Sequence, residues 1–191
     1  MKTGHVLGSL ILLILAAATI GGSSSANNNY EYRHNYTDIG MAFDLPVAGA
    51  DVNWMDMLGE PRVFLIFDFN SEHYSIEISV RDSGILRATD TVTDENLEKA
   101  WLGLGGQWSI SQHSPLTIRR ETVGDGIQWL VSGRLVSFGK MQTRSIRAVD
   151  NEADGHIDVV IEATDYGKVD YGLLENIVSS TTTYPVEVDW S

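Results

Sequence analysis

The sequence predicts an α+β fold in which an antiparallel meander sheet of about six or seven strands carries two amphipathic helices. Short stretches of alternating apolar and polar residues recur along the chain, separated by turns that combine Gly with Asp, Asn or Lys. Two other segments repeat their apolar residues every three to four positions, which is the helical period. Because the strands follow one another through tight turns, they favour an antiparallel meander.

Composition excludes several classes of function. The 191 residues include 13 Lys+Arg and 26 Asp+Glu, which gives a formal net charge of -13. Nucleic-acid binding is not expected, because a phosphate backbone requires a basic surface. The chain has no Cys, which excludes a disulfide framework, a Cys-based zinc site, a cysteine nucleophile and a lipid anchor on an N-terminal Cys.

The N-terminal segment 1–26 has the pattern of a secretory signal. Lys2 precedes an uncharged apolar run at 10–20, and small residues follow at 21–26. We expect cleavage after Ala26, or else an uncleaved signal anchor that would be the chain's membrane contact. In both cases the remainder is expected to be secreted or exposed at the cell surface.

The rest of the chain is expected to form one domain. Residues 27–37 are polar and predict a linker, and residues 38–183 predict a single α+β domain. Residues 184–191 predict a tail that either docks as a short edge strand or stays loose.

The first strands can be placed in order. Residues 41–45 alternate and predict a short strand that Pro46 ends. A loop is expected from 47 to 61. The stretch 62–70 is almost continuously apolar, which predicts a central strand covered on both faces. Residues 74–81 alternate and predict its hairpin partner.

The period then changes to that of a helix. Thr93 is the expected N-cap, and Gly105–Gly106 the expected end. The apolar stripe consists of Leu97, Ala100, Trp101 and Leu104, which places Trp101 toward the core.

A meander and a second helix complete the domain. Asp170 is the expected N-cap of this helix, whose apolar stripe includes Leu174 and Ile177. Thr181 to Thr183 and Pro185 are expected to end it. The four strands of the meander are predicted at 116–122, 127–136, 141–149 and 156–164.

This order of elements resembles the PsbP-like fold family. Two short motifs add to the resemblance: Gly40, Phe43 and Pro46 at the opening, and Ile177-Val178-Ser179-Ser180 at the end of the last helix. The resemblance covers about residues 36 to 182. It implies an antiparallel sheet between helical layers (an αβα sandwich), used as a binding or assembly module rather than an enzyme. It transfers no functional residue to this chain.

The sequence contains no dense catalytic motif. No Ser lies in a Gly-x-Ser-x-Gly pattern, and no two His have the spacing of metal ligands on one strand or helix. The expected function is therefore an exported, monomeric, non-catalytic module that engages a protein or cell-envelope partner. The alternatives are a hydrolase whose site is not visible in the sequence and a calcium-dependent surface protein.

The loop at 150–158 is the candidate calcium site. Asp150, Glu152, Asp154 and Asp158 stand at positions 1, 3, 5 and 9 of a pattern that resembles the front of an EF-hand loop. Position 12, however, is Ile161 rather than an acid. The alternative interpretation is an acidic hairpin turn, and no other cofactor is expected.

Two further sites are predicted. Arg120, Arg134 and Arg144 lie on neighbouring strands and would contact an anionic partner if they point the same way. The alternative for these arginines is pairing with acids across the strands, including Glu162. Asn35 begins an Asn-x-Thr pattern and is a candidate glycosylation site.

Overall fold

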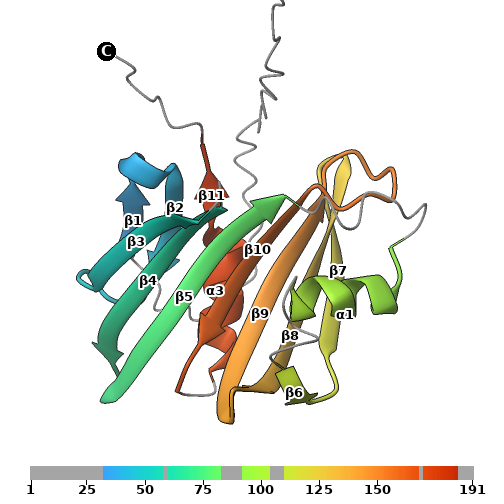
Figure 1. Cartoon of the computed structure of the whole chain (residues 1–191). Coiled ribbons are helices and arrows are strands. Elements are labelled where there is room, and N and C mark those ends of the chain that lie inside the picture. Colours follow the sequence, from blue (N-terminus) through green and yellow to red (C-terminus); the bar gives the residue numbers. More distant parts are fainter. Residues whose placement is uncertain (1–31, 58–59, 83–91, 104–109, 168–169, 185–191) are drawn as a thin grey trace, which may run out of the picture.

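The computed structural model describes residues 32–57, 60–82, 92–103, 110–167 and 170–184 (Figure 1). The predicted signal segment, most of the C-terminal tail and the Gly105–Gly106 helix end lie outside these residues. In chain order the elements are β1 (Tyr32–Tyr36), the 3-10 helix η1 (Thr37–Ile39), β2 (Met41–Leu45), β3 (Asp51–Met57), β4 (Glu60–Phe69), β5 (Glu72–Asp82), α1 (Asp94–Leu102), β6 (Ile110–His113), β7 (Thr117–Val123), β8 (Gly126–Ser137), β9 (Lys140–Asp150), β10 (Val159–Asp165), α3 (Tyr171–Ser180) and β11 (Thr182–Thr183).

The predicted α+β fold is confirmed, with a larger sheet than expected. Eight antiparallel strands form one sheet in the order β3-β4-β5-β10-β9-β8-β6, and β7 also pairs with β8. A second, three-stranded sheet has the order β1-β2-β11. The predicted strand at 41–45 therefore exists, but it belongs to the small sheet.

Four strands form where none was expected: β1, β3 and the short strands β6 and β11. Part of the predicted polar linker, Tyr32–Tyr36, is β1, which pairs along its whole length with β2. Part of the predicted loop is β3, which pairs with β4 from Asp51↔Ile66 to Met57↔Glu60. Both segments are rich in polar residues, so their alternation is weak, and pairing with an apolar neighbour decides their conformation.

The two faces of the large sheet carry separate cores. One core joins β4, β5 and β10 to α3 and the small sheet. The other core joins α1 to β8 and β9, and contains Leu97, Ala100 and Trp101. Figure 1 shows α1 in front of the sheet and α3 behind it. The αβα layering implied by the resemblance is therefore present, with the small sheet added to the α3 side.

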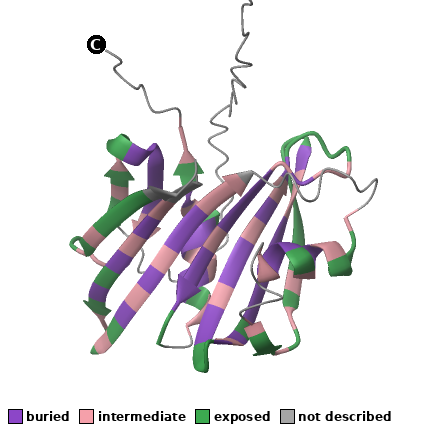
Figure 2. Ribbon diagram, viewed as in Figure 1, coloured by how far each residue is buried: buried purple, intermediate pink, exposed green. Residues whose placement is uncertain are grey.

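Strand β4 is not central, which corrects the prediction for residues 62–70. It lies second from an edge of the sheet. Val63, Leu65 and Phe67 face α3 and are buried, whereas Phe64 is half-buried and Ile66 is exposed. Figure 2 shows this alternation of burial along β4. The continuous apolar run thus supplies residues to both faces of β4, one of them buried and the other open to solvent.

Both helices begin at the predicted caps. The Thr93 hydroxyl accepts the Asn96 N–H at 3.3 Å, and the Asp170 carboxylate accepts the Leu173 N–H at 2.9 Å. Helix α1 ends earlier than expected. Gly103, with φ +76°, follows Leu102, and its N–H donates to the Lys99 carbonyl.

Candidate functional site

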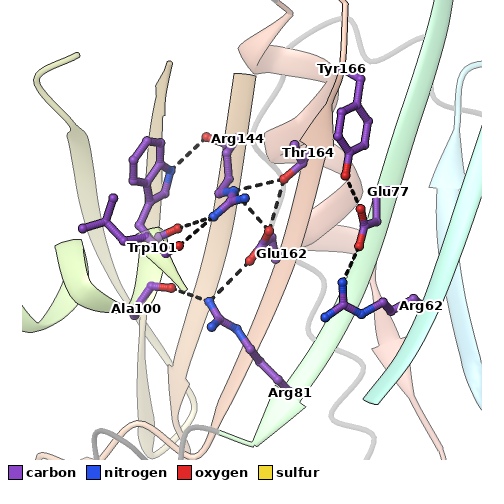
Figure 3. Close-up of polar contacts among 10 residues, drawn as sticks. Arg62, Glu77, Arg81, Ala100, Trp101, Arg144, Glu162, Thr164 and Tyr166 are labelled. Atoms are coloured by element: carbon purple, nitrogen blue, oxygen red, sulfur yellow. Dashed lines mark hydrogen bonds and ion pairs between the residues drawn. The ribbon is translucent and has the colours of Figure 1, made fainter. Parts of the chain in front are cut away.

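Ionic side chains gather on the α1 side of the sheet, beside the C-terminal end of α1. We call Arg81, Arg144, Glu162 and Thr164 the arginine–glutamate cluster (Figure 3). These residues come from β5, β9 and β10, which lie next to one another in the sheet. Alternation places Arg144 and Trp101 on one face, because Ile146 and Ala148 from the same strand pack against α1.

Glu162 is the centre of this cluster. Its Oε2 accepts Arg81 Nη2 at 3.3 Å, and its Oε1 lies 3.1 Å from Arg144 Nε. Thr164 accepts the same Arg144 Nε–H at 3.1 Å and donates to Glu162 Oε1 at 3.2 Å. All three charged side chains are mostly buried. One carboxylate therefore compensates two guanidinium groups.

The two arginines also bind the end of α1. Arg144 Nη1 donates to the Trp101 carbonyl at 2.8 Å and to the Leu102 carbonyl at 3.1 Å, and Arg81 Nη2 donates to the Ala100 carbonyl. The last carbonyls of a helix have no partner within it and carry partial negative charge. The cluster thus acts as a cap that ties α1 to the sheet.

Trp101 completes this attachment. Its indole N–H donates to the Arg144 carbonyl at 3.1 Å, and the Arg144 guanidinium lies 5.9 Å from the ring centroid. The ring is fully buried against Gly133 of β8. A Cβ at position 133 would meet Leu116 Cδ2 at 2.6 Å and Trp101 Cζ2 at 3.1 Å, so any larger residue there would force these side chains to shift.

A second ionic group lies beside the first. Arg62 Nη1 pairs with Glu77 Oε1 at 2.8 Å, and the Tyr166 hydroxyl donates to Glu77 Oε2. Burial, followed by the hydrogen bond and charge of Glu77, raises the pKa of Tyr166 well above its ordinary value of 10.0. Tyr166 therefore stays protonated as a hydrogen-bond donor across the neutral range.

These contacts give the ionic groups a structural role. Their partners include helix carbonyls, a threonine hydroxyl and each other. A general acid or base would have to face a substrate or a nucleophile. The contacts given above instead attach the end of α1 to the sheet.

The remaining part of this sheet face is more open. Helix α1 packs against β8 and β9, which leaves the β3–β4 side without a described helix over it. We define the open face as Met55, Phe64 and Ile66. Met55 is 44% exposed, Ile66 is 39% exposed, and Phe64 is half-buried. Apolar residues therefore lie at the surface beside the Arg62–Glu77 pair.

The four acids of the predicted calcium loop do not converge on one point. Asp150 is buried, and its two oxygens accept the N–H groups of Asp154 at 3.2 Å and Gly155 at 3.0 Å. Asp158 accepts the Asn151 N–H at 2.9 Å. Within the described ranges, no group of three or more His, Asp or Glu could hold a metal. The geometry of residues 150–158 matches the alternative interpretation, an acidic turn closed by its own carboxylates.

The three predicted anion-contact arginines do not form one stripe, which corrects that prediction. Arg144 faces α1, and Arg120 shares its face because it is paired with Trp129 of the α1 core. Arg134 faces the opposite side, where its guanidinium lies 5.9 Å from the Tyr171 ring of α3. Residues 134 and 144 differ in orientation because Arg144 is paired with Gly133, and successive strand residues point to opposite faces. Arg144 instead pairs with Glu162, as the alternative proposed.

Asn35 lies on β1 with its side chain exposed. Its Oδ1 accepts a hydrogen bond from the Tyr184 hydroxyl. This arrangement leaves the side chain at the surface, and glycosylation at Asn35 stays a prediction.

Sequence reasoning offered the Arg144–Glu162 pair as an alternative but missed Arg81 and Thr164. Arg81 and Glu77 stand at the polar positions of an alternating strand, a pattern that usually indicates a solvated face. The sequence does contain a feature that indicates buried ionic groups on this face: Glu77, Arg81 and Glu162 lie on strands whose other face is apolar.

Comparison with known proteins identifies no relative of this chain: no family model matches it, and no similar curated protein is found. Within the described residues, no helix is both long enough and apolar enough to cross a membrane.

Proposed function

We propose that this protein is an exported, non-catalytic binding module of the PsbP-like type that engages a protein partner of the cell envelope through the open face. The observation that supports the proposal is the exposed apolar surface formed by Met55, Phe64 and Ile66. Exposed apolar residues that gather on one face of a sheet are typical of interaction sites.

The composition of the open face fits protein recognition. Met is enriched in interface cores, and a flat apolar centre with a polar rim is the usual arrangement of such surfaces. The Arg62–Glu77 pair supplies that rim on the neighbouring strands. Ion pairs at a rim contribute orientation more than affinity.

Site-specific crosslinking tests this proposal. A photoreactive amino acid is placed at Ile66 in the full chain and activated in intact cells of the native host. Val123 on β7 is the matched control, because its exposed fraction of 40% almost equals the 39% of Ile66. We expect a covalent adduct of discrete mass at position 66 and none at position 123.

A companion variant separates binding from folding. Met55→Glu adds a charge to the open face at an exposed position and should abolish the adduct at position 66 without changing the melting temperature. Absence of an adduct at 66, or equal labelling at 66 and 123, would refute the proposal.

A further inference from the structure

The turn between β8 and β9 carries an exposed aromatic residue whose backbone conformation is unfavourable. Two residues, Phe138 and Gly139, connect Ser137 to Lys140. Both have positive φ, +49° for Phe138 and +75° for Gly139. Phe138 is also 86% exposed, more than any other exposed large hydrophobic residue in the described ranges. A bulky residue in the left-handed region is rare, because its Cβ crowds the backbone.

The rest of the chain shows that such a turn does not require phenylalanine. The β4–β5 hairpin has the same two-residue form, with positive φ at Asn70 and Ser71. Asn tolerates this conformation and is preferred in turns of this type. Phe138 therefore costs folding free energy through its backbone conformation, and its exposed ring recovers little of that cost through burial. A residue retained at such a cost is a candidate for function.

The surroundings of this turn differ in charge from the rest of the molecule. Met141, 58% exposed, follows the exposed Lys140. Residues 134–144 contain three basic residues and no acid, in a chain with 26 acids and a net charge of -13. Arg144 donates hydrogen bonds to carbonyls at the end of α1, and Arg134 lies against Tyr171. Lys140 is therefore the cation that stands next to the two apolar side chains.

We propose that Phe138, Lys140 and Met141, which we call the β8–β9 tip, insert into an anionic lipid surface. A hairpin tip presents a narrow apolar wedge, which suits the headgroup region of a bilayer better than the broad, flat contact of two proteins. An adjacent Lys attracts anionic headgroups. The acidic remainder of the molecule does not prevent this contact, because salt screens charges beyond about 8 Å at physiological ionic strength.

The tip lies on a different part of the molecule from the open face. It stands where β8 ends and β9 begins, at the lower rim of the sheet in Figure 1, whereas the open face lies on β3 and β4. Lipid contact at the tip and partner binding at the open face are therefore separable, and either can fail without the other.

The absence of Cys allows a direct test, because one introduced cysteine can be labelled uniquely. Met141→Cys in the full chain carries an environment-sensitive NBD dye, and Ser71→Cys at the β4–β5 turn is the matched control. Both are mixed with phosphatidylcholine vesicles, with or without about one-third phosphatidylglycerol. We expect the dye at 141 to brighten several-fold and shift to the blue on anionic vesicles, while the dye at 71 does not respond.

A second variant separates insertion from folding. Phe138→Asn in the Met141→Cys chain should reduce the apparent vesicle affinity about tenfold or more. The same change should raise the melting temperature by about 2 to 4 °C, because Asn relieves the backbone conformation. Lys140→Gln should weaken binding to anionic vesicles by about fivefold.

Four results would overturn the proposal. These are no response at 141 on anionic vesicles, an equal response at 71, an equal response on uncharged vesicles, and a response that Phe138→Asn leaves unchanged.

Discussion

Helices α1 and α3 lie on opposite faces of the same sheet, and arginines from the strands bind the C-terminal carbonyls of both. Arg144 and Arg81 bind the last carbonyls of α1. Arg147 binds the Ser179 carbonyl at 2.8 Å and the Thr181 carbonyl at 2.5 Å at the end of α3. Arg33 adds a bond of 2.6 Å to the Ser180 carbonyl. Both helices are therefore held to the strands by arginine side chains that hydrogen-bond their C-terminal carbonyls.

The two helices differ in what surrounds these arginines. Those at α1 share a buried carboxylate, Glu162. Arg147 has carbonyl partners, and burial lowers its pKa to about 10. The helix above it, α3, buries four apolar residues of its own: Leu173, Leu174, Ile177 and Val178. Helix α1 buries three residues, one of them Ala, so it depends more on Trp101 and on the ionic cluster.

Trp101→Ala should have the largest effect, because the fully buried indole is the main apolar attachment of α1. We expect the free energy of unfolding to fall by about 4 kcal/mol. Hydrogen exchange should accelerate across residues 94–102 more than across 171–180. If both helices lose protection equally, the attachment of α1 is not local.

Glu162→Gln should have the next largest effect, because it leaves two mostly buried guanidinium groups without their carboxylate. We expect a loss of about 3 kcal/mol in urea unfolding. Glu175→Gln on α3 is the matched control. Its partner Arg119 is half-exposed, and glutamine can still accept the Ser132 hydroxyl, so we expect a loss of at most about 1 kcal/mol. Equal losses would contradict the proposed difference between the helices.

The smallest expected effect concerns the pH dependence of the free energy of unfolding. Tyr166 on one face of the sheet and Arg147 on the other contribute to it with opposite signs. The pKa of Tyr166 is higher in the folded state than in the unfolded state, so its stabilising contribution is complete below about pH 10 and is lost as the pH rises further. Arg147 has a pKa of about 10 when folded, lower than in the unfolded chain, so its contribution to stability rises as the pH increases above about 10.

Tyr166→Phe should therefore reduce the fall in urea midpoint between pH 9 and pH 11. Part of that fall should remain, because burial also raises the pKa of Tyr36. Parallel curves for the variant and the parent would show that Tyr166 does not couple ionisation to folding.

The parts of the fold that the sequence predicts are those with a strong local period. Both helix caps and the hairpins from β7 to β10 were expected, because turn residues and apolar repeats mark them. The segments β1 and β3 were not, since their polar residues are ordered by neighbouring strands. Of the arginine–glutamate cluster, Arg81 and Thr164 were missed, because polar positions of a strand do not reveal which other strand lies beside them.

Gly133 links two segments that are far apart in the sequence. The Leu116 side chain and the indole of Trp101 both approach the space that a Cβ on β8 would need. A sequence that keeps α1 in this position therefore needs compatible side-chain volumes at positions 101 and 133. A larger residue at 133 needs a smaller side chain at 101 and a shift of the side chain at 116. Among distant sequences of the same architecture, we expect the two positions to co-vary in volume, which would mark relatives that share this attachment of α1.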